Sequence, residues 1–342
     1  MVVRLAFVLA CVLLPSIADA RPRWMTLPLP PALPEPADHG SVDVDGARIA
    51  YAIYGKGEPV VLLHGGLGNS SHFGFQLPAL VDKFQVIAID SRGQGRSTRT
   101  RATITYDLMA ADVVAVLDHL SIARASFVGW SDGGEVALKL GIKFPDRVNR
   151  LFVFGANYDA SGSKPHGSHS STFAGYTQKC RADYQRVFKT MKGFDALVDA
   201  LRPLWRNPAG ITQSQLRAIK APVAMADGDH DELIVMDQIA EMARLIPNGK
   251  LVVFNDASHF ALWQDPEAFN EAVVTFLTEP STPAGSPDYA DRPPATPAER
   301  LPGNSIDHLG DHSIDHLGDQ LNDHSGDQLN DHSGDRPPSR SQ

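Results

Sequence analysis

The chain has 342 residues, a formal net charge of −9, and hydrophobic and charged fractions of 43% and 21%. These values are those of an ordinary globular protein that is long enough to bury a sizeable core, as one large α/β domain or two small ones. Residues 301–342 hold eight Asp and two Arg, so this segment carries −6 of the net charge and the rest of the chain carries −3. A body so close to neutral has no basic excess that would favour nucleic acid as a partner.

The first residues of the chain have the pattern of a secretory signal peptide. Arg4 precedes an apolar run over 5–14, and an A-x-A cleavage motif ends at Ala20. Because the run is too short to span a bilayer, we expect residues 1–20 to be removed and the protein to be periplasmic or secreted, with no stable membrane insertion. Outside this segment Cys180 is the only cysteine, so no internal disulfide is expected.

Two segments of biased composition flank the part of the chain that is expected to fold. Residues 21–40 are rich in proline and predict an extended linker rather than a folded element. Residues 280–342 are polar and contain octad repeats over 306–337, in which Asp recurs every fourth residue. Such a tail is too polar to bury a core and is predicted to be disordered. Its five His each lie beside an Asp, so weak binding of a divalent metal or a partner is the non-enzymatic hypothesis, against a repeat with no selected function.

Residues 41–279 alternate short apolar runs with helical patterns, as expected of one α/β domain. A hairpin is expected around Asp45 and Gly46. The expected strands are 59–65, 84–90, 125–130, 150–156, 222–228 and 250–256, and the expected helices are 106–120, 135–144 and 266–277. This alternation predicts a mostly parallel sheet with helices on both faces. The rhythm breaks at about 157–212, which is predicted to be a helical cap over one end of the sheet, where ligands are selected.

Ser131 lies in the sequence GWSDGG, between an expected strand and an expected helix. Gly129 and Gly133 flank it at two residues on either side and allow the backbone to bend sharply there. An activated serine must be exposed, rigidly placed and close to a base, and the N-terminus of the following helix favours developing negative charge. The motif together with its position predicts that Ser131 is a nucleophile.

The acid and the base that would activate this serine are expected in loops after later strands. His259 directly follows the last expected strand and is the predicted base, whereas its rival His230 lies in the loop of the acid. In that loop Asp227 is expected at the strand end, and Asp231 is the predicted acid with Asp229 as the alternative. These aspartates lack the Gly and Glu that a calcium loop needs at its sixth and twelfth positions. No metal site is therefore predicted in the folded domain.

Two backbone N–H groups are needed to hold the oxyanion that forms when the serine attacks. Asp132 follows the nucleophile and is predicted to supply one of them. Gly66 in the HGGLGNSS loop is predicted to supply the other, with Leu67 as the less favoured donor and a candidate substrate contact, and with His64 organising the loop. Aromatic side chains that would line an apolar acyl pocket, or equally fill the core, are Phe73, Trp130, Phe260 and Trp263.

Five short motifs in this order resemble the α/β-hydrolase family over about residues 41–278. They are HGG (64–66), DSRGQGRS (90–97), GWSDGG (129–134), GDHD (228–231) and SHF (258–260). The resemblance implies an eight-stranded, mostly parallel sheet with a cap, no cofactor, and a structural turn at DSRGQGRS. It also implies that the nucleophile, acid and base are Ser131, Asp231 and His259, and that Gly66 and Asp132 form the oxyanion hole. A serine rather than an aspartate at the nucleophile position argues against haloalkane dehalogenase and epoxide hydrolase chemistry.

The elbow GWSDGG is also similar to that of the biphenyl hydrolase-like, valacyclovir-hydrolase group. There the residue that matches Asp132 is implicated in holding the ammonium of amino-acid esters, although an aspartate at this place also simply complements a helix N-terminus. The expected function is that of a serine hydrolase, a carboxylesterase that cleaves a small-molecule ester or related acyl bond through an acyl-enzyme. Amino-acid ester hydrolysis or aminopeptidase activity, C–C bond hydrolysis and perhydrolysis remain alternatives on the same fold.

Overall fold

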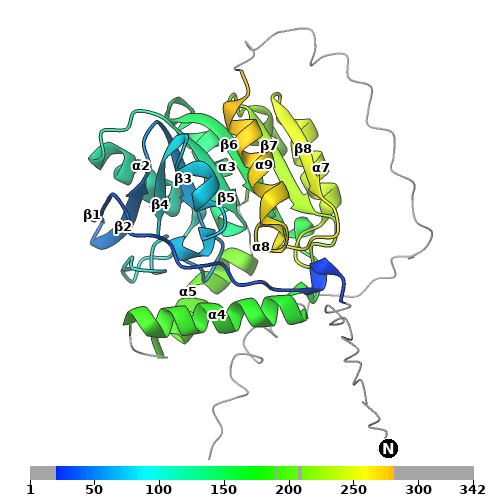
Figure 1. Ribbon diagram of the computed structural model, residues 1–342, viewed down its shortest axis with the longest axis horizontal. Coiled ribbons are helices and arrows are strands. Elements are labelled where there is room, and N and C mark those ends of the chain that lie inside the picture. Colours follow the sequence, from blue (N-terminus) through cyan, green and yellow to red (C-terminus); the bar gives the residue numbers. More distant parts are fainter. Residues whose placement is uncertain (1–20, 189–191, 207–209, 281–342) are drawn as a thin grey trace, which may run out of the picture.

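The structure is a computed structural model that describes residues 21–188, 192–206 and 210–280 (Figure 1). The predicted signal peptide and the octad repeats lie outside the described residues. In the part that is described, no helix has both the length and the apolar character needed to cross a membrane.

An eight-stranded sheet forms the centre of the molecule, in the order β1-β2-β4-β3-β5-β6-β7-β8. Its strands are β1 (Asp38–Val44), β2 (Ala47–Tyr54), β3 (Glu58–Leu63), β4 (Phe84–Ile89), β5 (Ala125–Trp130), β6 (Val148–Phe154), β7 (Val223–Gly228) and β8 (Gly249–Phe254). Only β2 pairs antiparallel, with β1 and β4, and every other neighbouring pair is parallel. The predicted mostly parallel α/β sheet is therefore confirmed.

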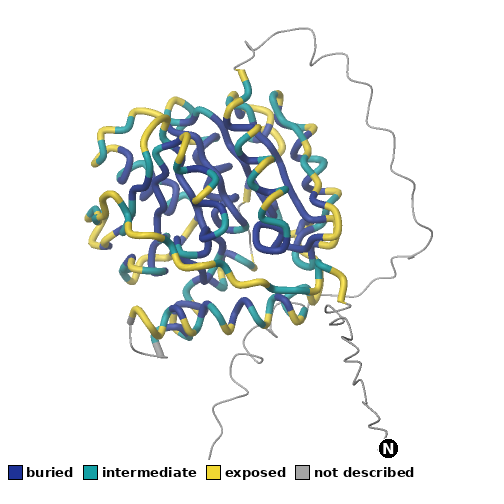
Figure 2. The backbone as a smooth tube through the Cα atoms, in the orientation of Figure 1, coloured by how far each residue is buried: buried dark blue, intermediate teal, exposed yellow. Residues whose placement is uncertain are grey.

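The hairpin between β1 and β2 follows from its two turn residues. Asp45 and Gly46 both have positive φ, 48° and 77°, and a two-residue turn of that kind matches the twist of antiparallel strands. Central strand β5 is buried along its whole length, whereas Leu251 and Val253 on edge strand β8 remain exposed. Buried backbone accordingly runs through the middle of the molecule and exposed segments surround it (Figure 2).

Helices cover both faces of the sheet, as the pleat of β6 demonstrates. Phe152 contacts Phe269 of α9 (Pro266–Thr278), and the next residue, Val153, faces Gly134 of α3 (Asp132–Lys143). Because successive side chains of a strand point to opposite faces, α3 and α9 lie on opposite sides. The remaining helices outside the cap are α1 (Leu77–Leu80), α2 (Tyr106–His119), α6 (Gln213–Arg217), α7 (Met236–Leu245) and α8 (Ala261–Gln264).

The cap lies between β6 and β7 and consists mainly of α4 (Ser171–Phe188) and α5 (Lys192–Arg206). Figure 1 shows these two helices beneath one end of the sheet, beside the ends of its strands. Short 3-10 turns lie in the loops at this end of the sheet and in the cap: η2 (Ser70–Phe73), η4 (Ala160–Gly162) and η5 (Gly167–His169). A further turn, η3 (Pro145–Arg147), connects α3 to β6.

The N-terminal segment 21–37 differs from the prediction of a free linker. It is extended, apart from one 3-10 turn, η1 (Arg23–Met25), but it is bound to the domain along its length. Arg23 donates to the carbonyls of Asn255 and Asp256 and to the carboxylate of Asp265. Proline lacks an N–H, so a proline-rich segment can lie on a surface without a strand partner. We call this segment the N-terminal strap; it extends the folded unit from residue 41 back to residue 21.

Candidate active site

The turn between β5 and α3 places Ser131 in a strained backbone conformation. Its φ and ψ are 55° and −123°, which for a residue other than glycine costs about 1–3 kcal/mol. The flanking glycines are required by contact: a Cβ on Gly129 would lie 2.3 Å from the carbonyl oxygen of Gly133, and one on Gly133 would lie 2.1 Å from that of Leu63. The start of the following helix thus lies too close to β5 and β3 for any side chain at either position, which explains the G-x-S-x-G spacing.

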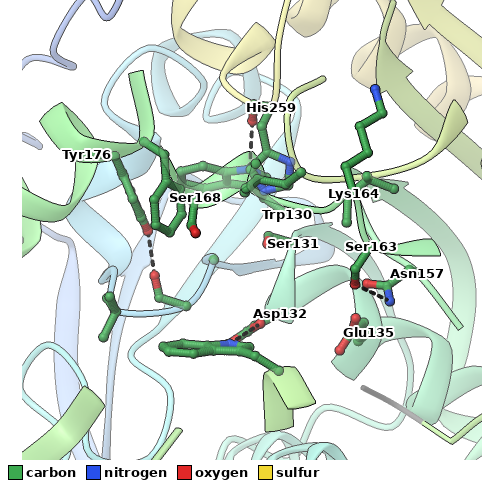
Figure 3. A pocket seen from close by; sticks show the side chains of 18 of the residues that line it. Trp130, Ser131, Asp132, Glu135, Asn157, Ser163, Lys164, Ser168, Tyr176 and His259 are labelled. Carbon is green, nitrogen blue, oxygen red and sulfur yellow. Dashed lines mark hydrogen bonds between the residues drawn. The ribbon is translucent and has the colours of Figure 1, made fainter. Parts of the chain in front are cut away.

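Hydrogen bonds to neighbouring elements hold this turn in place. The amide of Ser131 donates to Phe154 at the end of β6 over 2.8 Å, and the Ser131 carbonyl accepts from the amides of Gly134 and Glu135. The side chain has no hydrogen-bond partner within the described ranges and lines a cavity that His259 also lines. In Figure 3 Ser131 lies between His259 on one side and Asp132 on the other.

His259 and Asp231 form a buried pair at the ends of β8 and β7. Nδ1 of His259 lies 2.6 Å from Oδ2 of Asp231, and the amides of Leu233 and Ile234 donate to the other carboxylate oxygen. Burial opposes charge on both groups, but their mutual attraction and hydrogen bond outweigh it. The pKa of His259 is consequently raised above its ordinary value and that of Asp231 is lowered.

Tight packing fixes the imidazole on its other sides. A Cβ on Gly155 would lie 2.8 Å from Cε1 of His259, so only glycine fits beside the ring. The indole N–H of Trp130 donates to the carbonyl of His259, and the amide of His259 donates to the carboxylate of Glu232. With Nδ1 bound to Asp231, the imidazole presents Nε2 as its other reactive nitrogen.

The two rivals considered for the acid and base lie outside this pair. Asp229 accepts from His230 over 2.7 Å and from the amide of Ala257, and the His230 ring stacks on Trp24 of the N-terminal strap. The structure therefore brings Asp231 and His259 together and leaves Asp229 and His230 occupied with each other.

The two predicted oxyanion donors are unoccupied backbone amides. The Gly65 carbonyl accepts from Nδ1 of His64 over 2.8 Å and from the amide of Gly68. Because a trans peptide directs its C=O and N–H in opposite directions, these bonds also fix the N–H of Gly66, pointing away from them. Among the residues that the structure describes, neither this N–H nor that of Asp132 at the start of α3 has an acceptor.

His64 organises this loop, as predicted, and does not face the cavity. It is buried, and its Nε2 accepts from the amide of Ser91 over 2.9 Å. That bond leaves the proton on Nδ1, where it holds Gly65. The predicted structural turn lies alongside: the carboxylate of Asp90 accepts from the amides of Ser70 and Arg96, and a Cβ on Gly95 would lie 2.3 Å from the carboxyl carbon of Asp90.

The cavity has a volume of about 390 Å³ and is enclosed by the sheet edge and the cap. Of the predicted pocket residues, Leu67 and Trp130 line it. Phe260, Phe73 and Trp263 do not; Phe260 packs against Trp130, Tyr176 and Trp263 in a buried aromatic cluster. The prediction of Phe260 as a substrate contact is therefore wrong, because its ring faces the core. Lining residues that were not predicted include Tyr106, Glu135, Phe173, Tyr176 and Trp205.

The end of the cavity opposite His259 is acidic. Asp132 accepts from the hydroxyl of Tyr106 over 2.9 Å and from the indole N–H of Trp205 over 3.2 Å. Glu135, one turn further along α3, has a buried carboxylate oxygen without a hydrogen-bond partner in the described structure. Burial raises the pKa of both carboxyls, and the charge of Asp132 raises that of Glu135 further. This end is suited to a polar or cationic group rather than to an alkyl chain.

One cluster in the described ranges has the spacing of a metal site. Asp227, Asp231 and His259 each offer a ligand atom, and these atoms lie within 4.8 Å of one another. However, Nδ1 of His259 is committed to Asp231, and both oxygens of Asp231 already accept hydrogen bonds. We therefore assign the cluster to acid–base chemistry.

A nucleophile candidate on a strained elbow, an oriented imidazole and two open amides around one cavity define a hydrolase site of the α/β type. The sequence model of the α/β-hydrolase fold matches residues 58–187, from β3 into α4. The chain has the α/β-hydrolase fold, and this stretch of its sequence is similar to the α/β-hydrolase family.

Individual relatives differ in the reactions their names describe. A solved structure of "Est816 as an N-Acyl homoserine lactone degrading enzyme" is 29% identical, covers 69% of this chain and 100% of that chain, and has a TM-score of 0.58. A non-heme haloperoxidase of Rhodococcus erythropolis is 28% identical over 68% of this chain and 97% of its own length. The 2-hydroxy-6-oxononadienedioate/2-hydroxy-6-oxononatrienedioate hydrolase of Escherichia coli (strain K12) is 28% identical over 68% and 92%. These similarities define a hydrolase superfamily and not a substrate.

Proposed function

We propose that this protein is an exported serine hydrolase that cleaves a carboxylic ester or a related acyl bond of a small molecule. The observation that carries the proposal is the placement of Ser131 on the elbow, where it lines the same cavity as His259, the imidazole that Asp231 orients. A hydroxyl that lies on a strained turn and faces the same cavity as an oriented imidazole meets the requirements of an acyl-transfer nucleophile.

The reaction follows from the atoms available. Nε2 of His259 takes the hydroxyl proton as Ser131 attacks the acyl carbon, and the oxyanion receives hydrogen bonds from the amides of Gly66 and Asp132. The imidazolium then protonates the leaving alcohol, and an acyl-enzyme remains on Ser131. Water activated by His259 attacks this ester and releases the acid, while Asp231 stabilises the imidazolium throughout. Every proton taken up by His259 is returned within the cycle, so no cofactor is needed.

A second candidate is hydrolysis of amino-acid esters. It is favoured by the acidic end of the cavity, where Asp132 and Glu135 lie beyond Ser131 (Figure 3). Against it, Tyr106 and Trp205 already donate to Asp132, so an ammonium would have to share that carboxylate or use Glu135. Comparing an aminoacyl p-nitrophenyl ester with its des-amino analogue distinguishes the candidates, since only the second candidate predicts a preference for the free amine.

A p-nitrophenyl ester series of increasing acyl length, with wild type and Ser131→Ala, tests the proposed chemistry. We expect Ser131→Ala to lower kcat/KM by about three orders of magnitude or more. Ser214→Ala, on the exposed N-terminus of α6, is the matched control and should hydrolyse at the wild-type rate. Mass spectrometry after a single turnover should find the acyl group on Ser131. Appreciable turnover by the alanine variant would refute the mechanism.

Export is also proposed, on the basis of the signal-like sequence. Cleavage near Ala20 would leave the N-terminal strap intact, because Arg23, which binds the strap to the domain, lies after the cleavage site. Terminal sequencing of the protein from a bacterial host should find Arg21 first and the protein outside the cytoplasm. An uncleaved cytoplasmic product would contradict the proposal.

A further inference from the structure

Asp227 is a buried carboxyl that the proposed mechanism does not use. It lies near the end of β7, is 0% exposed, and belongs to the cluster in which its ligand atom and those of Asp231 and His259 lie within 4.8 Å of one another. One of its oxygens, Oδ1, accepts from the amide of Gly228 over 2.9 Å. The other, Oδ2, has no donor among the described residues. A buried carboxylate oxygen without a donor is costly and requires an explanation.

The surroundings of Asp227 argue against a second negative charge at this place. Asp231 holds its charge through His259 and two backbone amides. Lys164, a cation that acts on Asp227, donates through Nζ to the backbone carbonyl of Asp231 over 2.5 Å and not to Asp227. Two carboxylates this close in a buried site do not both ionise, and the one without a cationic partner keeps its proton. A proton on Oδ2 also gives that oxygen a role, since it can then donate to Asp231.

We propose that Asp227 is a positioning residue whose protonated carboxyl donates a hydrogen bond to Asp231 and thereby orients the His259–Asp231 pair. The catalytic role of Asp227 rests on the proposed function, whereas its protonation can be measured in the protein without substrate. Burial, the charge of Asp231 and the hydrogen bond to it all raise the pKa of Asp227 well above its ordinary value. The same bond contributes to the lowered pKa of Asp231.

The hydrogen bond from Asp227 determines how strongly Asp231 supports the imidazolium. A donor on Asp231 disperses its negative charge, so losing that donor should raise the pKa of His259. The other charged groups that act on this site are Glu232 and Asp132, which raise the pKa of His259, and Lys164, which acts on Asp227. None of them changes in the variants below, so a shift in the His259 titration reports on Asp227.

Two substitutions separate a neutral from an ionised Asp227. Asp227→Asn keeps a neutral donor of the same shape, and Asp227→Ala removes it. We expect the His259 pKa, from NMR titration of the imidazole, to stay within about 0.3 unit in Asp227→Asn and to rise by about half a unit or more in Asp227→Ala. The acid limb of kcat/KM should move in parallel. Infrared difference spectra should show a protonated carboxyl band at neutral pH that Asp227→Asn lacks.

The results that overturn the proposal are equally specific. A fall of the His259 pKa in Asp227→Asn, or a missing carboxyl band, would mean that Asp227 is ionised. An unmoved His259 pKa in both variants would reduce Asp227 to a structural role, whatever happens to the melting temperature. If Asp227→Ala does not fold, Asp227→Asn and the infrared band decide. Neither spectroscopic measurement needs turnover. Refutation of the proposed function by an active Ser131→Ala variant therefore remains distinguishable from refutation of this inference.

Discussion

The sheet edge and the cap contribute to the same cavity in different ways. Ser131 directly follows β5, and Asp231 and His259 lie in the loops that follow β7 and β8, so a short local sequence positions each of them. Tyr176 and Trp205 lie in the middle or at the end of cap helices and reach the site only across the tertiary structure. In the proposed mechanism the sheet edge supplies the reactive atoms, and the cap contributes residues that surround them.

Hydrogen bonds link the cap to each loop of the sheet edge. Trp205 donates to Asp132, Tyr176 to the carbonyl of Gly66, and Lys164 to the carbonyl of Asp231. A fourth link runs through Glu232, whose carboxylate accepts from Ser170 and Thr172 of the cap and from the amide of His259. The cap is therefore a structural support for the catalytic loops as well as a wall of the cavity.

The largest expected effect comes from Asp231→Asn, which changes the sheet edge and leaves every cap residue in place. Loss of the carboxylate should disturb the His259 tautomer and lower kcat by about three to four orders of magnitude. Asp229→Asn, two residues away and paired with His230, is the matched control and should cost less than tenfold. Steady-state kinetics on one ester measures both. Equal losses would mean that the loop as a whole, and not Asp231, matters.

A pH-dependent link between the two regions is expected to have the next largest effect. His72 of the sheet edge is fully buried and contacts Asp183 of α4 over 3.1 Å. Burial lowers the pKa of His72 to about 4 despite this bond. At pH values between about 4 and the ordinary His pKa, His72 binds a proton in the unfolded chain but not in the folded chain. Acidification through this range therefore lowers the free energy of unfolding by about 3 kcal/mol.

Denaturant unfolding of wild type and His72→Gln at neutral and mildly acidic pH measures this contribution. The variant should lose less stability on acidification, and the two curves should converge as pH falls. The lowered pKa of Asp183 acts in the same direction, because its stabilisation is lost as that carboxyl becomes protonated. His119→Gln, at an exposed helix end, should follow wild type. Parallel curves for wild type and His72→Gln would contradict the expectation.

The difference between the sheet edge and the cap also explains which residues of the site could be predicted from the sequence. Strands such as 125–130 are continuous apolar runs, and the residues after them share one sheet edge, so local patterns sufficed to select Ser131, Asp231 and His259 as candidates. Trp205 and Tyr176 look like ordinary apolar-face residues of helices, and no local pattern indicates that their polar atoms reach Asp132 and Gly66.

Two predictions failed for the same physical reason. Phe260 follows the predicted base, but which way its ring points is decided by Trp130, Tyr176 and Trp263, on other elements. Proline content correctly indicated that the N-terminal strap is extended. It carried no information on docking, which depends on Gln264 and other partners more than 200 positions away.

Tyr176→Phe sharpens the comparison by removing one cap contact while the sheet edge stays intact. The hydroxyl donates to the carbonyl of Gly66 over 2.7 Å, so its loss should loosen the oxyanion loop. We expect kcat to fall about tenfold with little change in KM, because the oxyanion forms only after binding. Tyr184→Phe, two turns further along α4 and away from the cavity, is the control. A change confined to KM would indicate that Tyr176 serves substrate binding instead.

The smallest expected effect concerns the N-terminal strap, which supports both regions from outside. Arg23 binds the loop between β8 and α8, which carries His259, and Leu27 approaches Gly175 of the cap. The Arg23 side chain is 38% exposed, so solvent screens its ion pair with Asp265. Arg23→Ala should therefore lower the free energy of unfolding by only about 1 kcal/mol. That corresponds to a fall in melting temperature of about 2–4 °C. Arg101→Ala, on an exposed loop, should leave the melting temperature within error. If Arg23→Ala also leaves it there, the strap lies on the domain without contributing to its stability, and the support of the catalytic loops comes from the cap alone.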